Sequence, residues 1–174
     1  VLTSTDAVGK LASIPVVAEV VNTTNKLRPA RKLMQSAIGV HAEAPLPKFH
    51  SATLRKRNAK RTVVTTFDER IGLFGTCYGN RNAPAMVEDL IAVFEHNGVG
   101  VEIVSNEQCC GMPKMELGDL DAVEKLKEAN IPRLLDLTAQ GLRITAPIPS
   151  CVLMYRQELP LLFPDDEQVG AVGR

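Results

Sequence analysis

The chain has 174 residues and no net charge, with 45% hydrophobic and 23% charged residues. This composition is typical of a soluble globular protein, and the length allows one domain with a hydrophobic core plus an appended segment. No apolar run approaches the roughly 20 residues that a membrane-spanning helix needs, and the first residues lack the basic and apolar regions of a signal peptide. We therefore predict no transmembrane segment and a cytoplasmic protein.

Charge is distributed unequally along the chain. Residues 1–61 contain 11 Lys/Arg and 3 Asp/Glu, a net charge of +8, whereas residues 62–174 contain 9 and 17, a net charge of −8. All four cysteines lie in the acidic part. Opposite charges indicate regions with different roles. We predict a helical segment with a basic linker over residues 1–61 and a cysteine-containing domain over residues 62–174.

Proline and glycine delimit the helices expected in the basic region. Pro15 and Pro29 stand where the first turn of a helix tolerates proline, and Gly39 is a typical helix end. Residues 41–61 lose helical periodicity and carry a run of Lys and Arg. This run is either a solvated connector or a dock for an acidic partner or an anionic membrane surface. Because aromatic residues do not interleave with the charges, we do not expect it to bind nucleic acid.

Strand and helix patterns alternate in the acidic region. The predicted strands are residues 71–74, 99–104 and 142–146. The predicted helices begin at Pro84, at Asp119 and near Ser150, with Pro132 interrupting the second helix or starting another. Such alternation is typical of a parallel sheet with right-handed crossovers. The predicted fold class is therefore α/β, with a small parallel sheet and flanking helices.

The four cysteines each follow one of the predicted strands. Cys77 follows the first strand, Cys109 and Cys110 follow the second, and Cys151 follows the third. Parallel strands end at the same edge of a sheet, so the three segments are expected to meet there. We predict that Cys77, Cys109, Cys110 and Cys151 bind an iron–sulfur cluster, for which thiolates are the usual ligands.

Small residues flank these cysteines. Gly75, Gly79 and Gly111 allow tight turns and a close approach of the backbone. Ser150 precedes Cys151 at an expected helix start, where N–H groups face an anionic ligand. We predict that these four residues contact the cofactor.

Roles without a cluster are also open to these cysteines. Four scattered cysteines are commonly part of an ordinary core. Structural zinc usually shows paired C-x₂₋₄-C motifs, which are missing here. A catalytic thiol needs a base, and the sequence places none of the three histidines, His41, His50 and His96, beside a cysteine. A non-redox interaction module with an empty or zinc-filled cysteine site remains the alternative function.

The residues around the cysteines resemble a known family. The spacing Cys77-x31-Cys109-Cys110-Gly111-x39-Cys151 is similar to the CCG domain of iron–sulfur oxidoreductases related to heterodisulfide reductase. Within this family the chain looks most similar to the C-subunit group of anaerobic glycerol-3-phosphate dehydrogenases. The segments that carry the resemblance are residues 75–80, 97–99, 109–113, 118–119, 149–151 and 158–160. It covers about residues 70–168 and, more faintly, residues 8–50.

The resemblance implies an electron-transfer subunit of an oxidoreductase rather than a catalyst acting alone. It implies a [4Fe–4S] cluster, a flavin dehydrogenase or ferredoxin-like donor, and a quinone or other acceptor that can be membrane-bound, with a peripheral position at the inner face of the membrane as one possibility. Members of this type carry further cysteine-rich domains, so an interior fragment with a single CCG domain is expected. Where some members have a fifth cysteine ligand, this chain has Met154.

Overall fold

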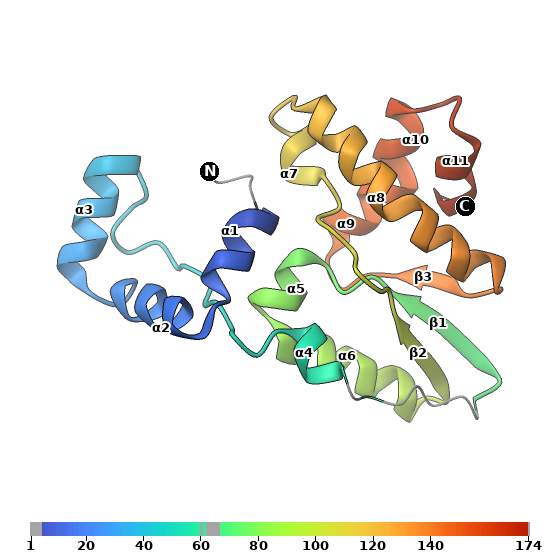
Figure 1. Ribbon diagram of the computed structural model, residues 1–174, viewed down its shortest axis with the longest axis horizontal. Coiled ribbons are helices and arrows are strands. Elements are labelled where there is room, and N and C mark those ends of the chain that lie inside the picture. The colour runs from blue at the N-terminus through green and yellow to red at the C-terminus, as the bar shows by residue number, and fades with distance from the viewer. Residues whose placement is uncertain (1–4, 60, 62–66, 174) are drawn as a thin grey trace.

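The structure is a computed structural model that describes residues 5–59, 61 and 67–173. At its centre is a parallel sheet of three strands, β1 (Glu69–Leu73), β2 (Val99–Ile103) and β3 (Arg143–Thr145), in the order β2-β1-β3. Helices flank this sheet on both sides (Figure 1). The predicted α/β fold with a small parallel sheet is therefore confirmed. The strands are shorter than predicted at their carboxyl ends, by one residue each.

The helices fall into four groups along the chain. Before the sheet come α1 (Thr5–Ala12), α2 (Pro15–Thr24), α3 (Arg28–Ile38) and α4 (Leu54–Asn58). Between β1 and β2 lie α5 (Cys77–Arg81) and α6 (Pro84–His96). Between β2 and β3 lie α7 (Met112–Met115) and α8 (Leu120–Ala139). After β3 come α9 (Pro149–Leu153), the π-helical turn η1 (Met154–Glu158), α10 (Leu159–Leu162) and α11 (Glu167–Gly173).

The sheet separates two apolar clusters. On one face, Ile71 and Leu73 of β1 pack with α6 and with Leu54 of α4. On the other face, α8 and the helices after β3 form a larger cluster with Phe74. Gly72 belongs to this second face, because a Cβ there would lie 2.6 Å from Ile144 and 3.0 Å from Leu137 of α8. Figure 1 shows α6 and α8 on opposite sides of the strands.

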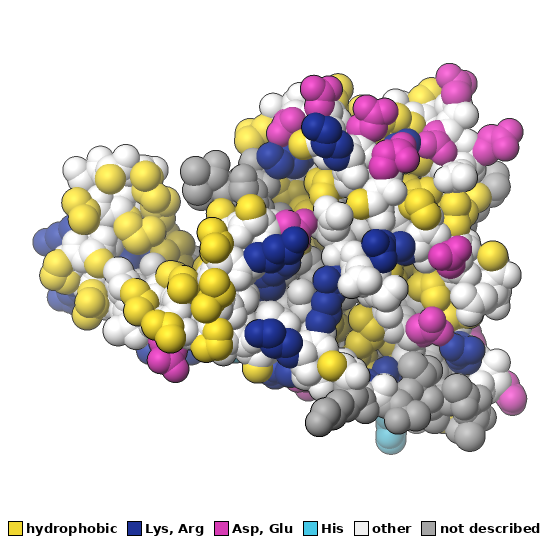
Figure 2. Space-filling view, viewed as in Figure 1, with side chains coloured by type: hydrophobic (Ala, Val, Ile, Leu, Met, Phe, Trp, Pro, Cys, Tyr) yellow, Lys and Arg dark blue, Asp and Glu magenta, His cyan; other side chains and the backbone are white. Residues whose placement is uncertain are grey.

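The N-terminal helices begin and end where proline and glycine predicted. Pro15 is the first residue of α2, Pro29 is the second residue of α3, and Gly39 ends α3 with a φ of 74°. In Figure 2 hydrophobic side chains gather on the surface of this part of the molecule. Six hydrophobic side chains of this part of the chain are each more than half exposed: Leu11, Val16, Val20, Leu27, Leu33 and Ile38.

The basic linker is bound to its own chain. Arg55 pairs with Glu107 at 3.1 Å, Arg57 pairs with Glu88 at 3.0 Å, and Arg61 pairs with Glu95. The short helix α4 also forms inside the stretch that was expected to lack helical structure. These basic side chains therefore meet carboxylates of the acidic region, and the division at residue 61 stays a prediction.

One helix differs from the prediction. α8 runs unbroken through Pro132, which was expected to interrupt it or to start another helix. A proline inside a helix costs about 3 kcal/mol. The buried side chains of Ile131, Leu134 and Leu137 hold this part of α8 against the sheet and offset that cost.

A helix that crosses a membrane needs about 20 predominantly apolar residues. Among the residues that the structure describes, no helix combines that length with that apolar character.

Candidate metal centre

The three cysteine segments meet at the carboxyl edge of the sheet. Cys77 is the first residue of α5, shortly after β1 ends in sequence, and Cys109 and Cys110 lie in the loop between β2 and α7. Cys151 lies in the first turn of α9, after β3. The topology thus delivers thiols from three successive strand ends to one edge, as the strand pattern predicted.

The sulfur atoms form a connected row. The Sγ atoms of Cys77 and Cys109 are 3.9 Å apart, and the Cys110 thiol interacts with those of Cys109 and Cys151. Cys109, Cys110 and Cys151 are 3–4% exposed, whereas Cys77 is only partly buried. The structure therefore brings all four predicted ligand residues together.

Crowding of thiols makes ionisation costly at this site. Hydrogen bonding with Cys109 and Cys151, together with burial, raises the pKa of the Cys110 thiol far above its ordinary value. Several thiolates side by side repel one another in a poorly solvated place. A positively charged iron centre would remove this penalty, since metal binding replaces the protons of its thiol ligands.

Unusual backbone conformations shape the two loops that carry Cys77 and the Cys109–Cys110 pair. Thr76 has a φ of 63° and a ψ of 155°, a combination that is nearly exclusive to glycine. Its buried hydroxyl accepts a hydrogen bond from Gly79 N–H at 2.9 Å, so the side chain caps α5. Gly111, directly after Cys110, has a φ of 97°. Strain of this kind at a non-glycine residue persists only where the surroundings enforce it, which marks the Thr76 loop as specifically shaped. Glycine adopts a positive φ without such strain, so Gly111 permits the turn after Cys110.

The residues predicted to contact the cofactor have different surroundings. A Cβ on Gly75 would lie 3.0 Å from Leu54, and one on Gly79 would lie 2.7 Å from Val87, so both positions are closely packed. Ser150 is an exposed second residue of α9 and does not cap this helix. Whether Gly75, Gly79, Gly111 and Ser150 contact a cofactor stays a prediction.

Two side chains that the sequence did not indicate hold Cys109. Asn130 of α8 donates to the Cys109 carbonyl at 3.0 Å and accepts from Gln108 N–H at 2.8 Å. Asp6 of α1 accepts from Cys109 N–H at 2.7 Å. Both residues are distant in sequence, so no local motif announces these contacts. The backbone of Cys109 is thereby fixed by side chains from two separate helices.

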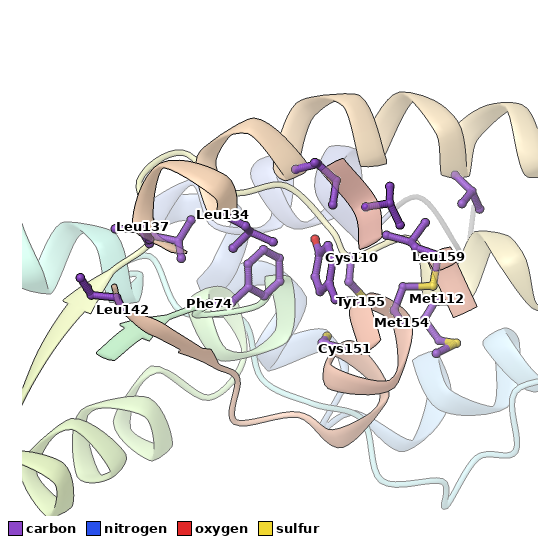
Figure 3. Close-up of a cluster of buried hydrophobic side chains, with 14 residues drawn as sticks. Phe74, Cys110, Met112, Leu134, Leu137, Leu142, Cys151, Met154, Tyr155 and Leu159 are labelled. Atoms are coloured by element: carbon purple, nitrogen blue, oxygen red, sulfur yellow. The ribbon is translucent and has the colours of Figure 1, made fainter. Parts of the chain in front are cut away.

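A buried tyrosine lies beside the thiols. The Tyr155 ring packs edge-on against Phe74, with ring centroids 5.2 Å apart, and Figure 3 shows both rings in the same buried cluster as Cys110 and Cys151. Burial, and next the thiol groups of Cys110 and Cys151, raise the pKa of Tyr155 well above its ordinary value. Asn130 is nearby, but among the described residues nothing completes a hydrogen bond with the Tyr155 hydroxyl. The Tyr155 phenol therefore stays protonated, and its ring contributes to the buried cluster.

A buried carboxyl group stands close to Cys109 in the same loop. Burial raises the pKa of Glu107 to about 7, against the opposing effect of Arg55. A Cβ on Gly75 would lie 3.3 Å from Glu107 Oε1, so the carboxyl group lies against the loop that leads to Cys77. It connects α4, through Arg55, to both cysteine loops.

The two ends of the thiol row differ in their access to the surface. Cys77 is partly exposed at one end. At the other end Cys151 borders a pocket of about 430 Å³, whose wall also includes Tyr155 and Arg156.

A single metal ion and an iron–sulfur cluster place different demands on their ligands. Among the residues that the structure describes, no three His, Cys, Asp or Glu side chains are gathered closely enough to hold a metal ion. A single zinc ion needs ligands that converge on one point. An iron–sulfur cluster takes thiolates at separate iron atoms, and so accepts ligands arranged around a larger core.

Comparison with known proteins gives a family and relatives. The family of the cysteine-rich domain CCG matches residues 71–156. The C subunit of anaerobic glycerol-3-phosphate dehydrogenase from Escherichia coli K12 is 29% identical over 162 residues, which is 92% of this chain and 40% of the relative. Its counterpart from Escherichia coli O157:H7 gives identical values. This chain therefore spans about two fifths of the length of these curated relatives.

A further relative matches a shorter stretch. The B subunit of the CoM/CoB fumarate reductase from Methanothermobacter marburgensis is 36% identical over 61 residues, which is 35% of this chain and 12% of the relative. No solved structure gives a significant match. By their names, all three relatives are subunits of oxidoreductases. The match at residues 71–156 contains most of the sheet and all four thiols, so this part of the chain matches the CCG cysteine-rich domain.

Proposed function

We propose that this chain is an iron–sulfur electron-transfer subunit or domain of an oxidoreductase. The observation that supports this most is the closeness of the thiols: the Sγ atoms of Cys77 and Cys109 are 3.9 Å apart, and the Cys110 thiol interacts with those of Cys109 and Cys151. In the proposal these four residues bind the cluster, of the [4Fe–4S] type. The bound cluster would accept and release one electron at a time.

The protein residues would set the properties of that cluster. Burial of Cys109, Cys110 and Cys151 excludes water from most of the site. The hydroxyl of Thr76 and the amide of Asn130 keep their loops in shape. Cys77 is the partly exposed cysteine of the four, and we place the entry of electrons there.

The proposed partners follow from the relatives. Because these relatives are subunits of a dehydrogenase and of a reductase, we infer that this chain works as part of a larger complex. We infer a flavin dehydrogenase or ferredoxin-like cluster as the donor and a quinone or another subunit as the acceptor. We propose that the chain is located in the cytoplasm, including a peripheral position at the inner face of the membrane.

The test is anaerobic purification and cluster reconstitution, followed by iron and sulfide analysis and low-temperature EPR of the reduced protein. We expect about four iron and four sulfide atoms per chain and a signal of a reduced cluster. Single changes of each cysteine to serine should lower the iron content, whereas Ser36→Ala on the exposed face of α3 should not. A chain without stoichiometric iron after reconstitution contradicts the proposal. Zinc without iron selects the interaction module instead.

A further inference from the structure

A carboxylate of the N-terminal helix contacts both cysteine loops. Asp6 lies in the first turn of α1, which packs against α5 (Figure 1). Its Oδ2 atom accepts the hydrogen bond from Cys109 N–H at 2.7 Å. Its Oδ1 atom accepts one from Arg81 Nη1 at 3.0 Å, and Arg81 ends the helix that Cys77 begins. One side chain thus connects the two loops from outside the 71–156 domain.

The ion pair between Asp6 and Arg81 is largely shielded from solvent. The Asp6 side chain is 23% exposed and the Arg81 side chain only 8%. The arginine lies against Gly9 of α1, where a Cβ would come within 2.6 Å of its Cδ atom. Hydrogen bonds to charged groups in such partly buried places are stronger than those on an open surface.

We propose that Asp6 is a positioning residue of the cysteine site: it fixes Cys109 and keeps the reduction potential of the bound cluster low. The inference rests on the proposed iron–sulfur function. Hydrogen bonds to cluster sulfurs and nearby positive charge raise such potentials, whereas negative charge lowers them. Asp6 accepts the hydrogen bond from Cys109 N–H, so this N–H does not donate to a cluster sulfur. The negative charge of Asp6 also disfavours the addition of an electron to the cluster. Arg81 offsets part of that charge.

The positioning role is measured in the metal-free chain. Amide exchange of Cys109, followed by NMR, should become about tenfold faster in Asp6→Ala, because a hydrogen bond to a charged group limits local opening. Asp6→Asn keeps an acceptor oxygen and should retain most of the protection. Asp89→Asn, which removes an exposed aspartate from α6, is the matched control and should change nothing. Unaltered Cys109 exchange in Asp6→Ala overturns the positioning role.

The effect on potential is measured in the reconstituted chain by an EPR-monitored titration. Asp6→Asn should shift the midpoint potential upward, Arg81→Gln should shift it downward, and Asp89→Asn should leave it unchanged. Equal potentials in Asp6→Asn and the unaltered chain overturn the tuning role. If the unaltered chain binds no cluster, the proposed function itself fails, while the exchange experiment still decides whether Asp6 positions Cys109.

Discussion

The side-chain amide of Asn130 contacts the backbone on both sides of the Gln108–Cys109 peptide. Its Nδ2 atom donates to Cys109 O at 3.0 Å, and its Oδ1 atom accepts from Gln108 N–H at 2.8 Å. The residue is 1% exposed, so water does not substitute for these bonds. A single position of α8 therefore holds the loop that presents two thiols.

Changing Asn130→Ala should lower the free energy of unfolding of the metal-free chain by about 2–4 kcal/mol, because two buried backbone groups lose their partners. Urea unfolding measures this. Asn97→Ala removes an exposed amide that donates to Val93 O, and should cost less than about 1 kcal/mol. If the free energy of unfolding falls equally in the two variants, the buried hydrogen bonds of Asn130 stabilise the chain no more than an exposed one does.

A second prediction concerns the cap of α5. Thr76→Val removes the oxygen that accepts from Gly79 N–H and keeps the shape of the side chain. We expect a loss of about 1–2 kcal/mol in unfolding free energy together with weaker iron binding. Thr76→Ser retains the hydroxyl and is the matched control. If Thr76→Ser is as damaging as Thr76→Val, the cap is not what this position supplies.

Gly111 and Gly118 permit a comparison of two left-handed glycines. Both have positive φ, 97° and 72°, but Gly118 is exposed with nothing within 4 Å of a Cβ. Alanine at either position should cost roughly 1–2 kcal/mol of stability. Only Gly111→Ala should also reduce the iron bound per chain, since it follows Cys110 directly. Equal iron content in both variants would contradict a ligating role for this loop.

The ion pair between Lys127 of α8 and Asp166 predicts that the stability of the chain depends on pH. The Lys127 ammonium, which donates at 2.7 Å, lowers the pKa of the Asp166 carboxyl group. Burial alone would lower the pKa of Lys127, but its hydrogen bonds to Asp166 and Glu128 outweigh this and raise it. A lowered aspartate pKa gives stability that is present above about pH 4 and lost as the pH falls through the pKa of the folded state.

Asp166→Asn should therefore destabilise the chain at pH 7 by about 1 kcal/mol, a typical value for a partly exposed pair. The difference from the unaltered chain should disappear in acid, which urea unfolding at several pH values would record. Asp165→Asn, at the exposed neighbouring position, should show neither effect. A difference that persists in strong acid, below the pKa of the folded state, would mean that the charge of Asp166 is not its source.

Patterns along the chain predicted the elements that carry the site. The prolines at 15, 29 and 84 stand in the first turns of helices, and the three strands lie within two residues of their expected bounds. These features depend on local sterics and on periodic burial, which a sequence displays directly. The meeting of the cysteines followed from the parallel order of the strands, which fixes the edge at which each one ends.

The contacts that shape the site were not predictable in the same way. Asp6 reaches Cys109 across 103 positions of the chain, and Asn130 reaches it from a helix whose pattern gives no sign of a polar contact. Thr76 adopts a conformation that its residue type disfavours, so local preference argued against it. Pro132 was wrongly expected to interrupt α8, because the packing of its neighbours outweighs the local cost.

In the proposed function, four thiols from three loops bind one polynuclear iron centre. Iron K-edge X-ray absorption of the anaerobically reconstituted chain tests it most directly. We expect a first shell of sulfur around iron, and scattering between neighbouring iron atoms that is lost in Cys110→Ser. Iron surrounded by nitrogen or oxygen, with no second iron nearby, would contradict it.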